Sequence, residues 1–271
     1  MRATTGRYRA AVDVGLQDRA AIVTGASRGI GRHVALALAA EGCRILLCGR
    51  DVDALAAVEA ELAGAAVPFP VDVTEPGAAE AMVTECQRAF GRLDVVVNNA
   101  GTAVPKPLDQ LTAADWQAGL EVNFLAAARL SVAAAPAMRA AGWGRLVHVA
   151  STSGREPDPN FAPYSAAKAA LLNLSTALSR AFAADGVLSS CVVPGVTVTE
   201  LVEANALATA ERTGRTPVEV MERMLAKQGV AAGRFGRPEE VAAAVVFLAG
   251  EPAGWITGAT LEVDGGTLRS V

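Results

Sequence analysis

The sequence predicts an α/β protein in which helices cover both faces of a doubly wound, seven-stranded parallel sheet. Three observations support this fold class. Seven short runs of β-type residues alternate with longer segments of helical spacing along almost the whole chain. The runs are nearly continuous in Val, Leu and Ile, as strands buried on both faces should be. A chain of 271 residues also suits one domain, which at this length buries roughly three quarters of its unfolded surface.

The predicted elements alternate regularly as far as residue 195. Strands are predicted at 20–25, 43–49, 66–72, 93–100, 144–151, 186–194 and 258–265. Helices are predicted at 30–40, 52–62, 78–90, 113–140, 164–184 and 238–248. Asp51 and Thr112 are placed to cap their helices. Glycines stand where helices should stop, at Gly42, Gly64, Gly142 and Gly186.

The sequence shows no internal repeat and no low-complexity linker, so we expect one domain at 18–271 after an N-terminal extension at 1–17. Only the segment 196–237 interrupts the alternation, with helix-like stretches at 199–208 and 216–227. Ligands of doubly wound sheets bind outside the carboxyl ends of the strands, and this segment follows such an end. We therefore expect it to be a substrate lid; the alternative is a surface excursion without a role.

Composition excludes several classes of function. The net charge is −4 without a basic stripe, which argues against a nucleic-acid partner. The four cysteines show no paired spacing, so neither a disulfide framework nor a metal site is expected. No uncharged apolar stretch reaches about 18 residues, so we expect no membrane span. The first 17 residues lack the apolar core of a signal peptide, and a cytoplasmic location is expected.

A glycine-rich turn follows the first predicted strand and precedes the first helix. It predicts a dinucleotide site, because its glycines permit a tight turn and a close approach of the backbone to a pyrophosphate. Free N–H groups at the start of the helix would face this anion. The candidate residues are Gly25, Ser27, Arg28, Gly29, Ile30 and Gly31.

The end of the second strand distinguishes NADP(H) from NAD(H). An NAD site usually has an acidic residue there, whereas this chain has Gly49 followed by Arg50. An arginine can pair with a 2′-phosphate through charge-assisted hydrogen bonds, and Arg28 offers a second such contact. NADP(H) is therefore favoured over the alternative that both arginines are ordinary surface charges.

Tyr164 and Lys168 are four residues apart in a helical segment, so both side chains project from one face. A phenol with a pKa near 10 is a poor base at neutral pH, but a nearby ammonium favours the phenolate and lowers that pKa. The pair could therefore exchange a proton with a substrate. Taken alone, the same spacing also suits an ordinary solvated helix face.

The order of several motifs along the chain favours the proton-exchanging pair over an ordinary helix face. The chain contains TGASRGIG at 24–31, NNAG at 98–101, YSAAK at 164–168 and PG at 194–195. With Asp72, Asn123 and Ser151 between them, these motifs resemble the classical short-chain dehydrogenase/reductase family over residues 18 to 266. The C-terminal segments at 233–250 and 255–266 are similar to its 3-oxoacyl-carrier-protein-reductase-like members. The resemblance implies a Rossmann-type sheet with strand order 3-2-1-4-5-6-7.

The resemblance also implies roles for four residues. Tyr164 would pass a proton to or from the substrate oxygen while the nicotinamide exchanges hydride. Lys168 would bind the nicotinamide ribose and tune Tyr164, and Asn123 would keep a water in the proton relay behind Lys168. Ser151 would hydrogen-bond the carbonyl oxygen, with Ser153 as the alternative.

Further cofactor contacts follow from the same resemblance. Asp72 and Val73 match the adenine contacts of the family. The motif beside the adenine ribose is matched by Asn99, Ala100 and Gly101. The nicotinamide side is matched by Pro194, Gly195, Val196 and Thr199. Asn98, by contrast, could simply satisfy backbone groups between strands. His33 and His148 are expected to be structural.

The leading functional hypothesis is an NADP(H)-dependent oxidoreductase that interconverts a ketone and a secondary alcohol. The alternatives are an NAD-dependent alcohol dehydrogenase and a dinucleotide-binding sensor without activity. The family implies a homotetramer or homodimer that forms through the helices carrying Asn123 and Tyr164. A small-molecule carbonyl or alcohol substrate is expected. The lid departs in length from the most compact carrier-protein reductases, which argues against an acyl-carrier substrate. Candidate pocket residues are Val104, Arg155, Glu156, Phe161, Leu201, Met221, Met224 and Leu225.

Overall fold

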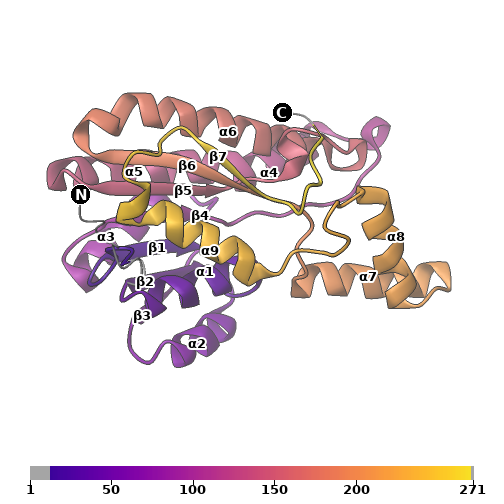
Figure 1. Cartoon of the computed structure of the whole chain (residues 1–271), viewed down its shortest axis with the longest axis horizontal. Coiled ribbons are helices and arrows are strands. Elements are labelled where there is room, and N and C mark those ends of the chain that lie inside the picture. Colours follow the sequence, from indigo (N-terminus) through magenta and orange to yellow (C-terminus); the bar gives the residue numbers. More distant parts are fainter. Residues whose placement is uncertain (1–12, 270–271) are drawn as a thin grey trace, which may run out of the picture.

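A computed structural model describes residues 13–269, apart from the side chain of Leu201. It contains a seven-stranded, all-parallel sheet of order β3-β2-β1-β4-β5-β6-β7, which confirms the predicted fold class and strand order (Figure 1). The strands are β1 Ala20–Thr24, β2 Arg44–Gly49, β3 Ala66–Pro70, β4 Val95–Asn98, β5 Gly144–Val149, β6 Val187–Pro194 and β7 Thr260–Val263. Each lies within a predicted run.

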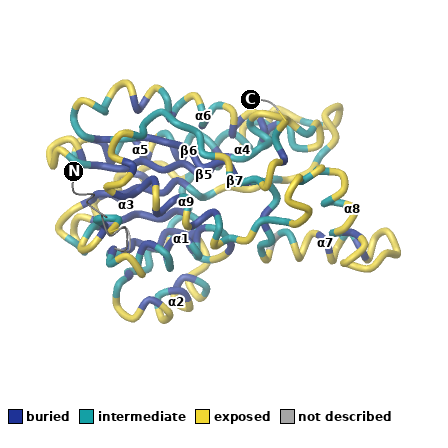
Figure 2. The backbone as a smooth tube through the Cα atoms, in the orientation of Figure 1, coloured by how far each residue is buried: buried dark blue, intermediate teal, exposed yellow. Residues whose placement is uncertain are grey.

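Helices cover both faces of this sheet because alternate residues of each strand point to opposite sides. Ala21 and Val23 of β1 pack in the cluster shared with α1, α2 and α9. Ala20 and Ile22 pack in the other cluster, shared with α3, α5 and α6. The strands form the dark, buried layer between the helices in Figure 2. These helices are α1 Gly29–Ala40, α2 Val52–Glu61, α3 Ala78–Phe90, α5 Ala126–Ala141, α6 Ala162–Phe182 and α9 Pro238–Ala249.

The predicted helix at 113–140 is interrupted. It consists of α4 Ala113–Leu120, a π-helical turn at Glu121–Leu125, and then α5. The turn contains Asn123, whose Nδ2 donates to the carbonyl oxygen of Gly119 at 2.9 Å. The Asn123 side chain thus donates to a backbone carbonyl at the point where the α-helical hydrogen bonding changes to π-helical. Single π turns of this kind are frequent at functional sites.

The run from Ala113 to Ala141 has the length and the mean hydropathy of 1.2 that a membrane-spanning helix needs. Its apolar residues Leu130, Ala134 and Met138 are buried in the cluster shared with α3 and the sheet. A core helix of a globular domain passes the same test, and these buried residues account for part of its apolar surface, since 33% of the apolar window is buried in the domain.

The caps predicted from the sequence are present. The Asp51 carboxylate accepts from the backbone N of Ala54 at 3.1 Å and so caps α2. Thr112 and Asp115 form a reciprocal capping box at the start of α4. Because each cap satisfies N–H groups that a helix leaves unpaired, the sequence marks these helix starts correctly.

The predicted N-terminal boundary is wrong. Residues 1–12 of the expected extension lie outside the described residues, but residues 13–17 belong to the domain. Leu16 is only 1% exposed and packs in the core, and its carbonyl oxygen accepts from the Cys43 thiol at 3.5 Å. The carbonyl oxygen of Val14 accepts from the backbone N of Glu251 at 2.9 Å. No sequence pattern predicts this packing, because one buried leucine forms no periodic pattern.

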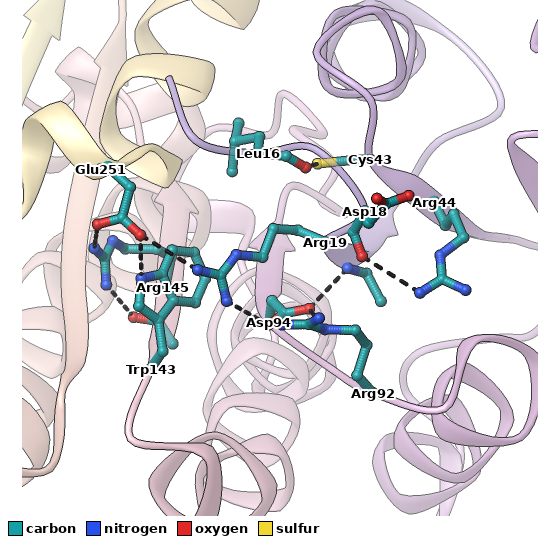
Figure 3. Close-up of polar contacts among 12 residues, drawn as sticks. Leu16, Asp18, Arg19, Cys43, Arg44, Arg92, Asp94, Trp143, Arg145 and Glu251 are labelled. Carbon is teal, nitrogen blue, oxygen red and sulfur yellow. Dashed lines mark hydrogen bonds and ion pairs between the residues drawn. The ribbon is translucent and has the colours of Figure 1, made fainter. Parts of the chain in front are cut away.

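A buried carboxylate joins the amino ends of the central strands (Figure 3). Asp94 accepts from Arg19, from Arg92 and from the backbone N of Ala20, with distances between 2.6 and 3.1 Å. The Arg19 guanidinium also stacks 3.7 Å from the ring centre of Trp143. Several donors therefore share the charge of one carboxylate that is 1% exposed. This cluster lies at the amino ends of the strands, whereas the glycine turn lies at their carboxyl ends. It stabilises the sheet on which the site is built.

The segment 196–237 forms two helices, α7 Glu200–Thr213 and α8 Pro217–Gln228, which project from the body of the domain (Figure 1). The ends of the segment pair with each other: Val198 N donates to the carbonyl oxygen of Gly236 at 2.9 Å, and Gly236 N to that of Val196 at 3.0 Å. The helices bury a small cluster of their own, made of Ala206, Ala210 and Val220.

Candidate active site

The glycine turn after β1 is held against the end of β4. A Cβ at Gly31 would lie 2.2 Å from the carbonyl oxygen of Gly25, so only glycine fits there. Asn99 Nδ2 donates to the carbonyl oxygen of Thr24 at 2.9 Å, and Thr24 Oγ1 accepts from the backbone N of Asn99 and of Ala100 at 3.0 Å. The turn and the NNAG motif, far apart in sequence, therefore form one rigid unit.

The N-terminus of α1 holds an anionic group. Gly29, with φ +55°, donates its backbone N–H to Oε2 of Glu200 at 3.0 Å. Thr199 lies beside it, since a Cβ at Gly29 would be 3.4 Å from Thr199 Cγ2. The carboxylate stands in for a phosphate at this position, because both present anionic oxygens to a helix N-terminus. The residues present thus fit a dinucleotide, whose pyrophosphate these N–H groups would bind. Sequence reasoning found the turn and Thr199 but missed Glu200.

The predicted 2′-phosphate contacts lie at the end of β2. Arg50 is largely exposed, and its Nη1 lies 3.8 Å from Oδ2 of Asp72. A Cβ at Gly49 would lie 3.7 Å from Ser27 Oγ, so the strand end adjoins the glycine turn. Arg28, at the start of α1, is exposed as well. Two arginines with exposed side chains therefore lie at the carboxyl end of the sheet near the glycine turn; their contact with a 2′-phosphate stays a prediction.

Asp72 is fixed by a local turn rather than by Arg50 alone. Its Oδ1 accepts from Thr74 Oγ1 at 2.7 Å and from Thr74 N at 3.0 Å. These two hydrogen bonds, more than the Arg50 guanidinium, hold the pKa of Asp72 below its usual value. Val73 beside it is partly buried against the core. The carboxylate is therefore ionised and oriented in the position that the resemblance assigns to the adenine contact.

Ser151, Tyr164 and Lys168 meet at the carboxyl end of β5. Ser151 follows this strand and its Oγ accepts from Ser153 N at 3.1 Å, so the Ser151 side chain is anchored by its own turn. The Ser151 hydroxyl hydrogen-bonds Tyr164, which is partly buried on α6. Of the two serines, Ser151 is the one whose hydrogen bond lowers the pKa of Tyr164. The structure therefore brings Ser151, the preferred serine, to Tyr164.

The pKa of Tyr164 departs from the sequence expectation. Burial raises it above its ordinary value, and the hydrogen bond from Ser151 lowers it only in part. Lys168, expected to depress it, lies 5.7 Å from the centre of the phenol ring and donates instead to the carbonyl oxygen of Val149 at 2.7 Å. The predicted direction of this shift is therefore wrong for this structure, because desolvation of the phenolate outweighs the lysine. The phenol is held in its protonated, donor form.

Lys168 is itself buried, at 3% exposure, and burial lowers its pKa to about 8. The ammonium lies beside Gly101, where a Cβ would be 3.6 Å from Nζ and 2.6 Å from Oδ1 of Asn123. Asn123 binds the backbone of Thr102 on both sides: its Oδ1 accepts from the N–H and its Nδ2 donates to the carbonyl, each at 3.0 Å. The side chain thus holds the loop after β4 against Lys168; the predicted water relay stays a prediction.

The predicted nicotinamide-side residues lie where β6 ends. Gly195 N donates to the carbonyl oxygen of Val263 at 3.1 Å, and a Cβ at Gly195 would lie 2.9 Å from Asp264 Cα. Pro194, Gly195 and Val196 therefore connect the sheet to Thr199, which touches the glycine turn. The predicted contacts from β1, β4, β5 and β6 thus line one edge of the sheet.

His148 and Asn98 form a buried polar path across the sheet. Asn98 Nδ2 lies 3.0 Å from Ser131 Oγ on α5 and 3.1 Å from His148 Nδ1. The other ring nitrogen of His148 lies 3.2 Å from Ser189 Oγ, which contacts Ser175 on α6. Burial, with a smaller effect of the Lys168 charge, lowers the pKa of His148 to about 3. His148 therefore has the structural role expected of it, and the Asn98 amide contacts side chains on α5 and β5.

The two charged pocket candidates are engaged by residues outside the predicted pocket. Arg155 pairs with Glu262 on β7 at 2.9 Å, while Glu156 accepts from the backbone N of Arg269 at 2.9 Å. Lys227, at the end of α8, pairs with Asp158 at 3.2 Å. Val104 is largely exposed. The side chain of Leu201 lies outside the described residues. The Lys227–Asp158 ion pair thus connects α8 to the loop before Tyr164.

Comparison with known families identifies this arrangement. A family model described as short chain dehydrogenase matches residues 19–209. The chain belongs to the short-chain dehydrogenase family. The match agrees with the order of motifs, with the sheet topology and with the meeting of Ser151, Tyr164 and Lys168.

Individual short-chain dehydrogenases match over nearly the whole chain. The cis-4-hydroxycyclohexanecarboxylate dehydrogenase of Sinomonas cyclohexanicum is 36% identical over 252 residues, which cover 92% of this chain and 96% of the relative. The 3-oxoacyl-acyl-carrier-protein reductase of Escherichia coli K12 is 35% identical over 250 residues, covering 92% and 97%. The predicted resemblance to the 3-oxoacyl-carrier-protein-reductase-like members is confirmed.

A solved short-chain dehydrogenase shows the same fold in complex. The L-sorbose reductase of Gluconobacter frateurii, determined with NADPH and L-sorbose, superimposes with a TM-score of 0.92 at 31% identity, covering 96% of this chain and 100% of that protein. Together, the family and its members make this chain an oxidoreductase of the class that acts on alcohols and ketones.

Proposed function

We propose that this chain is an NADP(H)-dependent oxidoreductase that interconverts a ketone and a secondary alcohol, with Tyr164 as general acid and base. The observation that supports this most is the meeting of a hydrogen-bonded Ser151–Tyr164 pair with the buried Lys168, next to a turn that binds anions. A phenol held protonated by burial is suited to donate to a carbonyl oxygen.

The roles of the residues follow from their positions. Tyr164 gives its proton to the substrate oxygen in reduction and takes it back in oxidation. Ser151 donates to the same oxygen and holds it beside the phenol. Lys168, with a pKa of about 8, is mostly cationic at neutral pH and stabilises negative charge that forms on Tyr164 after proton transfer. The nicotinamide, when bound, supplies or accepts the hydride. Asn123 positions the loop at 101–102 through its contacts with Thr102.

NADP(H) is proposed over NAD(H) because Gly49 and Arg50 stand at the end of β2, where an NAD site usually has an acidic residue. Arg28 in the glycine turn offers a second contact for a 2′-phosphate. The 2′-phosphate would lie near the Arg50 guanidinium, which keeps most of its surface exposed. We further propose that 196–237 is the substrate lid. The predicted assembly into homotetramers or homodimers also stays a proposal; light scattering after size exclusion tests it.

The first experiment pairs cofactor with substrate. Purified protein is titrated with NADPH and with NADH, and turnover is then followed at the nicotinamide absorbance band. The substrates are a cyclohexanone carboxylate, a 3-oxoacyl thioester and L-sorbose, after the names of the relatives. Turnover of one ketone with preference for NADPH supports the proposal. Preference for NADH would favour the NAD-dependent dehydrogenase, and binding without turnover of any ketone or alcohol would favour the sensor.

A further inference from the structure

One hydrogen bond joins the projecting helices to the cofactor turn. Glu200 is the first residue of α7, and its Oε2 accepts from the backbone N of Gly29, the first residue of α1, at 3.0 Å. The two residues are 171 positions apart in sequence. Thr199, which caps α7 through the backbone N of Val202, packs against the same glycine. The start of α7 therefore rests on the start of α1.

Glu200 supplies the only carboxylate that the described structure places on this helix end. The first turn of α1 contains no acidic residue, and Arg28 at its N-cap makes no side-chain capping bond. A helix N-terminus carries a partial positive charge and unpaired N–H groups, which an anion stabilises. Glu200, although remote in sequence, thus caps the N-terminus of α1 as a neighbouring residue usually does.

The same N–H groups are those that would bind the cofactor pyrophosphate. We propose that Glu200 competes with this pyrophosphate for the N-terminus of α1, so that cofactor binding releases the start of α7. This inference rests on the proposed function, since it needs a dinucleotide as the competing anion. Two anions cannot share one N–H at hydrogen-bond distance without strong repulsion. The carboxylate must leave as the phosphate arrives.

Cofactor binding and the Glu200–Gly29 contact affect each other reciprocally. If the Glu200 contact opposes cofactor binding, bound cofactor weakens that contact by the same factor. The lid segment therefore senses whether the dinucleotide site is filled. The ion pair between Lys227 and Asp158 at the far end of α8 is separate from this contact, so release begins at the α7 end.

Glu200→Gln tests the competition with almost no change in shape. The amide keeps an oxygen that can accept from Gly29 N but removes the negative charge. Glu203→Gln is the matched control: Glu203 is also in the first turn of α7, is exposed and carries the same charge, but makes no contact with Gly29 among the described residues. Both variants have the same net charge, so any difference between them is local.

The measurement is the dissociation constant of NADPH by isothermal titration calorimetry. We expect NADPH to bind Glu200→Gln at least fivefold more tightly than wild type and Glu203→Gln within twofold of wild type. Adenosine 2′-monophosphate, which lacks the pyrophosphate, should bind all three proteins equally. Glu200→Ala provides a second variant that should show the same gain, and circular dichroism verifies that each protein is folded.

Hydrogen exchange of residues 200–213 gives a readout independent of affinity. NADPH should accelerate exchange at the start of α7 in wild type, whereas Glu200→Ala, which loses the contact with Gly29, should exchange fast without it. Equal NADPH affinity of Glu200→Gln and Glu203→Gln, or an equal gain for adenosine 2′-monophosphate, would overturn the competition while leaving the proposed function standing. If wild type bound neither NADPH nor NADH, the proposed function itself would fail, and this inference with it.

Discussion

The ammonium of Lys168 lies over the face of the Tyr164 ring, 5.7 Å from its centre, and donates to the carbonyl oxygen of Val149. Burial raises the pKa of Tyr164 and lowers that of Lys168 to about 8. Both shifts favour the neutral form of the pair. Proton transfer from the phenol therefore needs the hydrogen bond of Ser151 and the remaining charge of Lys168 to stabilise the phenolate.

Removing the phenolic oxygen should abolish the chemistry and leave binding unchanged. We expect Tyr164→Phe to lower kcat by roughly 10²–10⁴-fold, the usual range for general acid–base catalysis. The dissociation constant of NADPH should stay within twofold. Turnover assays and calorimetry on the same preparation measure the two effects. Full turnover of Tyr164→Phe would exclude Tyr164 as the proton donor.

The two serines before α6 should behave differently. Ser151→Ala removes the hydrogen bond to Tyr164 and should lower kcat at least tenfold. Ser153→Ala leaves that hydrogen bond in place and should keep kcat within twofold. Steady-state kinetics of both variants under one condition decide the matter, and a reversed ranking would assign the role to Ser153.

Arg50 should determine cofactor choice. We expect Arg50→Ser to weaken NADPH binding about tenfold or more, because a charge-assisted contact with the 2′-phosphate is lost. NADH, which lacks that phosphate, should bind as to wild type. Titration of both cofactors against both proteins is the measurement. An equal loss for NADPH and NADH would show that Arg50 acts on general cofactor affinity.

His148 should make the fold sensitive to acid. Its pKa is about 3 in the folded protein and about 6.5 in the unfolded chain, so the unfolded state binds the proton first as pH falls. The stabilisation is complete above pH 6.5 and is lost between pH 6.5 and 3, at about 1.4 kcal/mol per pH unit.

Urea unfolding at pH 7.5 and pH 5 measures this loss. His148→Gln, which keeps hydrogen-bonding groups but does not titrate, should lose about 2 kcal/mol less than wild type between these two pH values. Equal losses in both proteins would place the acid sensitivity elsewhere.

Asp94 should stabilise the scaffold without affecting the site. Asp94→Ala leaves Arg19 and Arg92 without their buried carboxylate, and we expect a loss of about 3–5 kcal/mol in the free energy of unfolding. The control is Asp185→Ala, which breaks an exposed pair with Arg139 and should cost below about 1 kcal/mol. Denaturant unfolding gives both values. A loss of similar size in both variants would contradict a special role for Asp94.

The strands and most helices could be predicted because their signals are local. A strand such as β6 is a continuous apolar run, and Asp51 and Thr112 mark helix starts by their own chemistry. The π turn escaped prediction because the apolar spacing around Asn123 stays helical. Leu16 escaped because a single buried leucine has no period.

In the candidate active site, too, the features with local sequence signals were predicted and those that depend on the whole fold were not. The Tyr164–Lys168 spacing correctly predicted that both side chains lie together. The pKa of Tyr164 depends on burial by the whole fold, which spacing does not reveal, so its direction was predicted wrongly. Glu200 contacts Gly29 across most of the chain, and no local pattern announces such a pair.

The paired ends of the segment 196–237 make it a replaceable module. Val196 and Val198 hydrogen-bond Gly236 from both sides, so chain entry and exit lie next to each other. The two helices between them also have their own small apolar cluster. A short turn, or the corresponding insert of another short-chain dehydrogenase, could be joined at these two points without moving a strand. With the proposed lid role of 196–237, grafting this one segment should exchange substrate preference while Ser151, Tyr164 and Lys168 stay in place.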